Sequence, residues 1–368
     1  MVEKRKLSNR ILGSIFFSVV LFISGISAFA QQTKILTAEK HNEYGLIYTL
    51  PVTSFEVKVV VEKKTFKAGP YYKYAKKYAA TDNVVSQDDE SWTIKEIHVK
   101  PFGIPDDENK YLMQLKAGAL TYLEVDKDGM LLAINTKVDP TSDDWSFVPV
   151  YNGMDLDDDE YLKYVGEDFV AAISSAKRAQ LLGEELLEIR DAKLSLTRGT
   201  ADTMPTDGRQ LELMLQSLER QENAIMAAFV GNVTSETMER VFTFTPDSDG
   251  RTVLFRMSDF IGPVEADDYS GDPVYVDVKV VSKGELPVDS KGEEKKMPKD
   301  GVAYCIPGVA ELTLTLKGEV LYQKLHELSQ LGVVFGLSPS VFTDKKEPSF
   351  AIFDPSTGAL KELGSVKD

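Results

Sequence analysis

Alternating apolar and polar residues predict β-strands near both ends of the chain. Residues 55–62, Phe-Glu-Val-Lys-Val-Val-Val-Glu, follow the two-residue period of a half-buried strand. Similar runs predict strands over 44–51, 91–99, 240–245, 252–256 and 274–281. The Asp128-Gly129 pair lies between apolar runs at 119–125 and 130–134, an arrangement typical of a β-hairpin. Residues 282–300 are charged and have no apolar period, so we expect a loop there.

The period changes to a helical one between residues 166 and 231. Leu182, Leu186 and Ile189, and later a second series from Leu211 to Ile225, recur at helical spacing. The segment between the two series, residues 199–208, is polar and rich in Gly and Pro. We therefore predict a helical hairpin, with Asp207 capping the start of the second helix.

A shorter helix is predicted directly after Gly69-Pro70, because proline is well tolerated at the first position of a helix. This short helix would place tyrosines on one face and lysines on the other. The tyrosine face comprises Tyr71, Tyr74, Ala75 and Tyr78, and the lysine face comprises Lys73, Lys76 and Lys77.

The two β-rich ends resemble each other. Residues 45–51, Gly-Leu-Ile-Tyr-Thr-Leu-Pro, align with residues 301–307, Gly-Val-Ala-Tyr-Cys-Ile-Pro, so that Cys305 corresponds to Thr49. The apolar spacing of Leu321, Leu325 and Leu328 predicts a short helix over 318–330 in the second copy. Each copy then ends in a hairpin. This order of elements indicates an internal duplication; the alternative is two unrelated hairpin units.

These elements predict an α+β fold, with two related β-rich units, each carrying a short helix, linked through a helical hairpin. The expected boundaries are a leader over 1–30, an N-terminal β-rich unit over 31–150, an acidic turn and the hairpin over 151–235, and a C-terminal β-rich unit over 236–368.

The first thirty residues have the pattern of a secretory signal peptide. Four basic residues precede an apolar run over 11–23, and Ala28-Phe29-Ala30 forms a small-x-small cleavage site. We expect cleavage after Ala30 and a mature chain in the periplasm or cell envelope. An uncleaved anchor is the alternative, although the apolar run is short for a membrane span. No later stretch is long and apolar enough to cross a membrane.

Composition excludes several classes of function. The 368 residues include 58 Asp and Glu, 42 Lys and Arg, 3 His and 1 Cys, with a net charge of −16. Removing four basic residues and one acidic residue with the leader leaves a charge of −19. Such an acidic chain is a poor partner for nucleic acid. One cysteine cannot form an intramolecular disulfide or a cysteine-rich metal site.

The search for catalytic motifs is largely negative. The nucleophile elbow, the P-loop, the dinucleotide-binding fingerprint and the HExxH zinc motif are all missing. The acidic run over 155–160 departs from the EF-hand pattern, so we expect no metal site and no cofactor. We expect Cys305 to be a small core residue. His326 is placed on the predicted helix over 318–330, shielding the edge of the core.

Two features are candidates for binding or modification. Lysines and aromatic residues interleave over 58–78, and this cluster could contact an anionic or glycan surface through ring stacking and charge. Its candidate ligand-binding residues are Tyr71, Tyr72, Lys73, Tyr74, Lys76 and Lys77. The alternative is an amphipathic helix with a packed tyrosine face. Separately, Asp202-Thr203-Met204 resembles a short bacterial O-glycosylation pattern, which makes Thr203 a candidate modification site.

Four stretches carry a resemblance to a known family: residues 44–51, 68–75, 188–194, and 255–259 with 267–271. Through them the chain is similar to an uncharacterised exported family of gut Gram-negative bacteria, domain of unknown function 4831. The resemblance implies export and a shared architecture but no activity. We expect a binding or scaffolding protein whose partner is an envelope protein or glycan. The alternative is a carboxylate-based enzyme acting on carbohydrate or envelope polymer.

Overall fold

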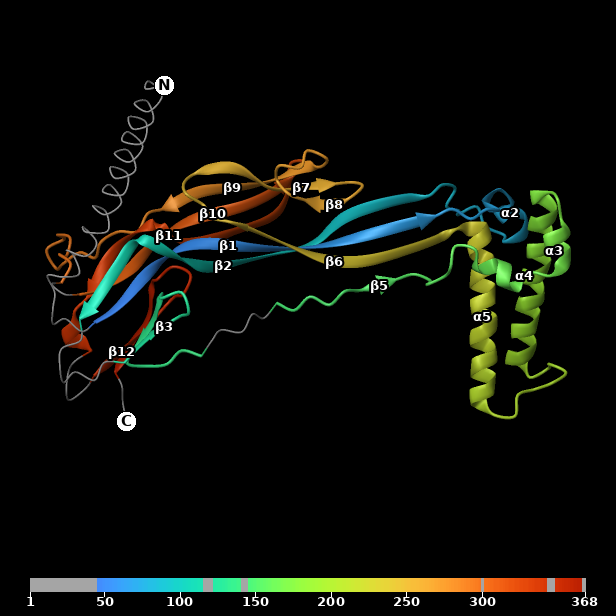
Figure 1. Cartoon of the computed structure of the whole chain (residues 1–368), viewed down its shortest axis with the longest axis horizontal. Helices are drawn as coiled ribbons and strands as arrows, with labels where there is room; N and C mark the ends of the chain where they lie inside the picture. Colours follow the sequence, from blue (N-terminus) through green and yellow to red (C-terminus); the bar gives the residue numbers. More distant parts are fainter. Residues whose placement is uncertain (1–44, 115–121, 140–144, 299–300, 343–347, 366–368) are drawn as a thin grey trace, which may run out of the picture.

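A computed structural model describes residues 45–114, 122–139, 145–298, 301–342 and 348–365. The molecule is elongated, with a β-rich body at one end and helices at the other (Figure 1). The described helices are η1 (Tyr72–Tyr74), α2 (Ala75–Tyr78), η2 (Glu160–Tyr164), α3 (Glu167–Ala171), α4 (Ser175–Arg198), α5 (Gly208–Val230) and η3 (Pro339–Val341). The mixture of sheets and few helices confirms the α+β class. No helix among these residues is long and apolar enough to span a membrane.

Three antiparallel sheets make up the body. The first has the order β2-β1-β6-β5, the second β11-β10-β9-β7-β8 and the third β13-β12-β4-β3. Their bounds are β1 (Gly45–Lys67), β2 (Asp89–Gln114), β3 (Leu123–Val125), β4 (Leu131–Ile134), β5 (Tyr151–Asn152), β6 (Asn232–Phe244), β7 (Gly250–Ser258), β8 (Gly262–Val264), β9 (Asp272–Ser282), β10 (Val302–Leu316), β11 (Glu319–Leu337), β12 (Ser349–Phe353) and β13 (Leu360–Ser365).

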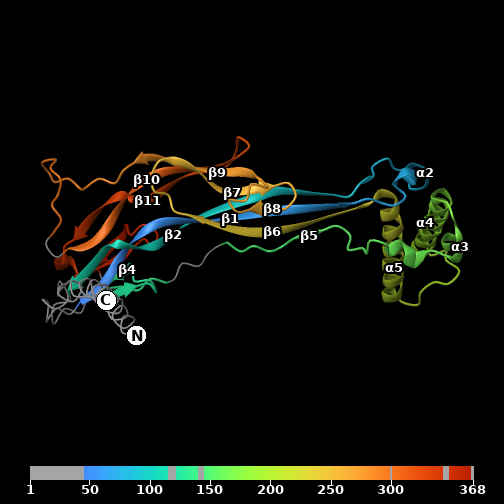
Figure 2. The same ribbon diagram turned by 45° about the horizontal axis from the view of Figure 1, so that its top comes forward.

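Strand β1 runs through the length of the molecule and contributes to two hydrophobic cores. Its start, at Tyr48 and Leu50, packs in a core with β4, β10 and β12. Its middle, from Phe55 to Val61, packs in the main core, where Phe242 of β6 stacks on Phe255 of β7 at 4.4 Å. Its end continues with β2 and β6 as a three-stranded ribbon that leads to the helices (Figure 2). At about 3.3 Å per residue, the 23 residues of β1 span roughly 75 Å.

Most of the predicted elements are confirmed, and one is wrong. The hairpin of α4 and α5 is present, and the Asp207 side chain accepts a 2.8 Å hydrogen bond from the Gln210 N–H. Nearly all of the predicted helix over 318–330 instead belongs to strand β11, whose residues 319–328 and 333–337 pair with β10. His326 therefore lies on a strand, where its ring contacts Phe55 edge-on at 5.0 Å.

Thr49 in β1 and Cys305 in β10, which the sequence alignment pairs, make similar backbone contacts. The Thr49 N–H donates to the Gly129 carbonyl at 3.0 Å, and the Cys305 N–H donates to the Gly358 carbonyl at 3.0 Å. Both bonds belong to isolated parallel bridges, and the pairing register of each strand shifts close to its bridge. The burial of Cys305 confirms its place as a small core residue and raises the pKa of its thiol to about 12.

Candidate functional site

The candidate site is the helical tip, formed by residues 68–88 and 153–231. It has a hydrophobic core of its own, in which Tyr71, Leu182, Leu186, Ile225 and Phe229 are buried. The two segments enter the tip from different strands of the ribbon, one after β1 and the other before β6. The tip is therefore a separately packed unit at the end of the molecule opposite the β-rich body (Figure 1).

A close approach at Gly69 joins the two segments of the tip. A side chain at Gly69 would place a Cβ atom 2.6 Å from the Ala228 carbonyl oxygen. The Tyr71 N–H donates a 2.9 Å hydrogen bond to the same oxygen. Only glycine fits this position, so the first segment can pack against the C-terminal end of α5.

The aromatic residues of the predicted binding cluster belong mainly to the core of the tip. Tyr71 is buried and meets Tyr161 and Phe169 edge-on at 6.1 and 6.2 Å. Tyr74 and Tyr78 are half-buried and pack against the same core. The Tyr71 ring is therefore not available for stacking on an external ligand.

Lys73, Lys76 and Lys77 are exposed, as the amphipathic interpretation expects. The Lys73 ammonium is 5.7 Å from the centre of the Tyr72 ring, and Lys77 is 4.7 Å from that of Tyr78. Lys76 pairs with Asp82 at 2.9 Å. The exposed part of the cluster is thus a small basic surface formed by Lys73, Lys76 and Lys77 beside Tyr72.

A buried carboxylate fixes the acidic turn to α5. Glu160 is 2% exposed, and Arg220 donates to both of its oxygens, at 2.5 Å to Oε1 and 2.8 Å to Oε2. Tyr164 Oη and the Asp157 N–H also donate to Glu160. Hydrogen bonds from Arg220 lower the pKa of Glu160 and more than offset the effect of burial. The turn is therefore tied to the tip at Glu160.

A hollow of about 280 Å³ lies at the base of the tip beside this turn. Several of its carboxylates are already engaged. Asp88 accepts from the Ala68 N–H, Asp157 pairs with Lys163, and Glu160 pairs with Arg220; in each case the pKa of the carboxyl is lowered. Across the described ranges, no cluster of His, Cys, Asp and Glu has the arrangement of a metal site.

A second hollow, which we call the distal hollow, lies between the outer halves of α4 and α5. It has a volume of about 600 Å³, and its walls combine apolar residues, such as Leu196, Met214 and Leu218, with uncharged polar residues, such as Ser217 and Gln221. Asp202 is the single ionisable residue among those that line it. In so acidic a chain this surface is poor in charge, as the buried centres of protein interfaces are, which favours contact with an uncharged partner surface.

The loop between α4 and α5 closes the outer end of the distal hollow. Helix α4 ends at Gly199, whose φ of +70° provides the left-handed turn that ends many helices. Thr203, the predicted modification site, is exposed in this loop and lines the rim of the hollow. Sequence reasoning located the loop and Thr203, but did not find the hollow or the pairing of Glu160 with Arg220. Separations of 20 to 60 residues leave no local pattern for such contacts.

Residues 44–361 match the family described as Domain of unknown function (DUF4831). This chain belongs to that family. The match covers most of the sequence and includes both the body and the tip, so the elongated architecture is contained within one DUF4831 region. No curated protein and no solved structure matches the chain.

Proposed function

We propose that this DUF4831 protein is an exported envelope protein that binds or scaffolds a partner through its helical tip. The observation that carries the proposal is the charge-poor distal hollow on a separately packed unit. Because the ribbon of β1, β2 and β6 holds this unit away from the main core, a partner could reach it without contacting the body.

The rigidity of the connection supports a scaffolding role. Pairing of β1 with β2 and β6 continues to Phe66 and Lys67, directly before the tip. Gly262, in the β8 hairpin, packs close against Trp92, whose indole N–H donates to the Phe260 carbonyl at 3.2 Å. The second sheet of the body therefore braces the start of the ribbon.

The internal duplication is part of this proposal. The contacts of Thr49 with Gly129 and of Cys305 with Gly358 are the same, as the sequence alignment of the two copies expects. The turns also agree: Asp126 and Asp354 each accept backbone hydrogen bonds through Oδ1 from residues two to four positions later in the chain. In this account the first segment of the tip, residues 68–88, is inserted into the N-terminal copy, and the second segment, residues 153–231, links the two copies.

The carboxylate-enzyme alternative has weaker support. A general acid needs a carboxyl group whose pKa is raised, so that it carries a proton at neutral pH. In the hollow of about 280 Å³ at the base of the tip, the pKa values of the carboxyl groups of Asp88, Asp157 and Glu160 are lowered, not raised. Each of these carboxylates accepts a hydrogen bond from the protein in its charged form, which is typical of a structural role.

Site-specific photocrosslinking in cells tests the proposed contact. A photoreactive amino acid at Ser217, which lines the distal hollow, is expected to capture a defined partner protein. The same amino acid at Gln323, exposed on β11 in the body, is the control and is expected not to capture it. Met214→Glu should abolish capture from position 217 without changing thermal unfolding. Equal capture at both positions, or none at 217, would contradict the proposal.

A further inference from the structure

A groove on the body lies between strand β6 and the β8 hairpin, and we call it the β6 groove. The groove has a volume of about 590 Å³. Residues 239–242 of β6 line one side, and Pro263 and Val264 of β8 with the following loop line the other. The groove is separate from the helical tip, so a ligand bound there is independent of the proposed function of the tip.

The outer edge of β6 offers unpaired backbone groups in this groove. The Thr237 N–H points away from β1, because it donates to the Val150 carbonyl at 2.9 Å. By the two-residue period of a strand, the backbone groups of Glu239, Val241 and Thr243 face the same way. Within the described ranges, β6 beyond Thr237 has no backbone partner other than β1.

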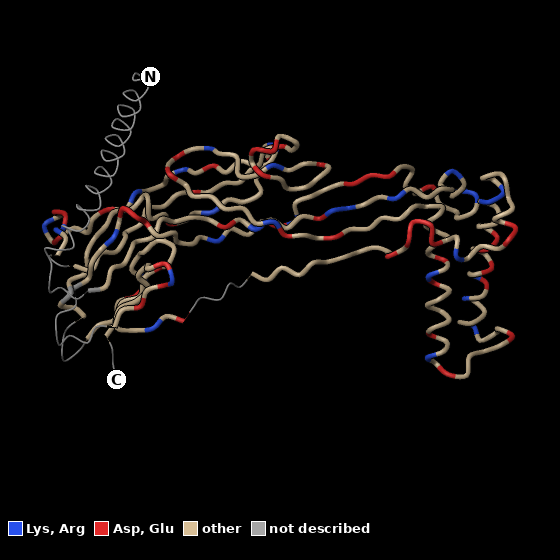
Figure 3. Tube along the Cα trace, in the orientation of Figure 1, with Lys and Arg blue, Asp and Glu red and all other residues tan. Residues whose placement is uncertain are grey.

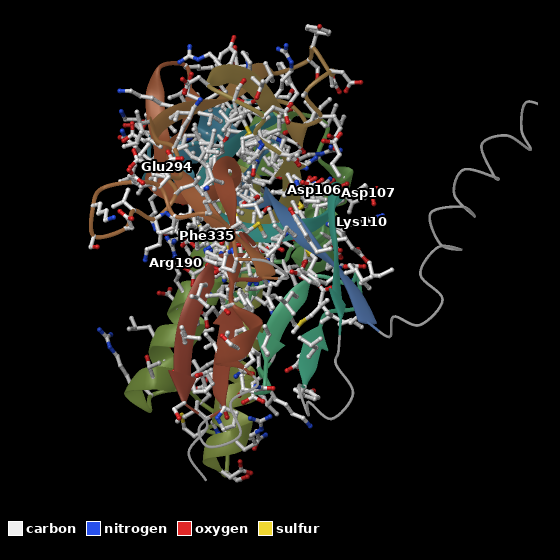
Figure 4. All side chains as sticks on the ribbon, turned by 90° about the vertical axis from the view of Figure 1, so that its left-hand side faces the viewer. Asp106, Asp107, Lys110, Arg190, Glu294 and Phe335 are labelled. Atoms are coloured by element: carbon white, nitrogen blue, oxygen red, sulfur yellow. The ribbon has the colours of Figure 1, made fainter. Side chains whose placement is uncertain are left out.

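Other edges of the body are protected against added strands. The outer strand β2 contains Pro101 and Pro105, which cannot donate a backbone hydrogen bond. Asp107 and Lys110 form a charged pair at 2.7 Å near its end, beside Asp106 (Figure 4). At the edge strand β11, the Gly284 N–H donates to the Leu331 carbonyl. Beyond Thr237 the β6 edge contains no proline, and no backbone group in the described ranges bonds to its outer side, although the Trp145 indole N–H donates a 2.5 Å hydrogen bond to the Glu239 carboxylate.

The charge of the groove selects the occupant. Glu265, Asp267 and Asp268 line it, and Arg240 is the single basic residue of the lining. Glu239 also lines the groove, but its carboxylate accepts a hydrogen bond from the Trp145 indole. The acidic loop after β8 is visible in Figure 3. Edge-to-edge pairing of two copies of this chain would bring these carboxylates together, which like-charge repulsion opposes. A basic segment has the complementary charge.

We propose that the groove binds an extended peptide segment rich in Lys or Arg, which adds as a strand to the outer edge of β6. The segment's backbone would bond with Glu239, Val241 and Thr243, as in other cases of strand addition. Alternate side chains of an added strand point to opposite faces, so basic residues at every second position would face the carboxylates of Glu265 and Asp267. These two carboxylates determine the preference for positive charge.

Binding of a defined probe to the full mature chain tests this inference. The probe is a fluorescent octapeptide of alternating Lys and Thr, and the comparison peptide alternates Glu and Thr. Fluorescence anisotropy should show binding of the first peptide only, weakened as NaCl increases. Hydrogen exchange should show protection of the amides at 239, 241 and 243 when the peptide is bound.

Two matched double variants distinguish binding in the groove from non-specific electrostatic attraction of the basic peptide to an acidic protein. Glu265→Gln with Asp267→Asn should weaken binding by about tenfold, since each removes a charge facing the added strand. Glu293→Gln with Glu294→Gln removes the same charge from an exposed loop elsewhere on the body (Figure 4) and should change affinity less than about twofold. Equal weakening by both pairs, binding without amide protection, or no binding of the basic peptide would overturn the proposal.

Discussion

Arg220 holds both carboxylate oxygens of Glu160, at 2.5 and 2.8 Å, although the two residues are 60 positions apart in the chain. Glu160 is buried, whereas the Arg220 side chain is about half exposed. This pair joins the acidic turn to α5 and thereby closes one side of the helical tip.

We expect Glu160→Gln to destabilise the tip. The amide would retain the shape of the side chain but lose the charge that pairs with Arg220, at a cost of about 1–3 kcal/mol. Hydrogen exchange of α5 should become faster, while exchange in β10 should not change. The double variant with Arg220→Met serves as control, because it also removes the unpaired cation. Unchanged exchange of α5 in the single variant would show that the pair is not stabilising.

The same pair predicts a loss of tip stability in acid. Because the pKa of Glu160 in the folded protein is lower than its ordinary value of 4.5, the stabilisation is fully present above that value. It is lost as the pH falls below 4.5 and through the folded-state pKa. Thermal unfolding followed between pH 7 and pH 3 should show this loss, and Glu160→Gln should reduce it. An identical pH dependence in the variant would contradict this assignment.

The contact at Gly69 predicts a selective effect on the first segment of the tip. Gly69→Ala places a Cβ atom 2.6 Å from the Ala228 carbonyl oxygen and should cost about 1–3 kcal/mol. Hydrogen exchange of the amides over 70–79 should become faster, because this segment no longer packs closely against α5. Gly166→Ala is the matched control, since a Cβ atom there meets nothing within 4 Å. Similar effects of both substitutions would show that the close approach at Gly69 is unimportant.

The duplication predicts that threonine can replace Cys305. Thr49 occupies the corresponding position, and the Ser329 carbonyl lies 3.6 Å from the Cys305 sulfur, where it could accept from a threonine hydroxyl. We expect Cys305→Thr to change the free energy of unfolding by less than about 1.5 kcal/mol. Cys305→Leu should cost more, because overpacking a buried site is destabilising. Denaturant titration compares the two; a larger cost for threonine would argue against the correspondence.

The mass of the native protein tests export and modification together. Residues 1–44 lie outside the described residues, so cleavage after Ala30 remains a prediction. We expect an intact mass corresponding to a chain that begins at Gln31, with added glycan mass at Thr203. Thr203→Ala should remove only the added mass. A mass equal to the unmodified cleaved chain would exclude glycosylation, and retention of residues 1–30 would exclude cleavage.

Local patterns predicted the helical hairpin, its cap at Asp207 and most strands, because those signals lie within a few residues of each other. The helix predicted over 318–330 was wrong for a physical reason. Leu321, Leu325 and Leu328 have helical spacing, but Leu325 is 60% exposed and only Leu328 is deeply buried. Pairing of β11 with β10 overrides the local pattern, as it often does for strands.

Contacts between residues far apart in the chain could not be predicted from local sequence patterns. The acidic run over 155–160 has the composition of a solvated turn, yet Glu160 is buried because Arg220 approaches it from α5. Likewise β12 pairs with β4, and β6 pairs with β1, so the two β-rich ends share sheets. The spacing of residues predicted the tyrosine and lysine faces of the short helix, and Tyr71 is packed as the amphipathic interpretation expects. Its partners Tyr161 and Phe169 lie too far along the chain for a local pattern to show them.

The most direct test of the central claim removes the distal hollow and leaves the rest of the tip in place. Replacing residues 192–218 with a short Gly-Ser loop deletes the last 7 of the 24 residues of α4 and the first 11 of the 23 residues of α5 but retains the Arg190–Glu222 and Glu160–Arg220 pairs. The measurement is the amount of the partner, first identified by crosslinking at Ser217, that co-purifies with the shortened protein from cells. We predict loss of the partner with unchanged unfolding of the body; full retention of the partner would contradict the account.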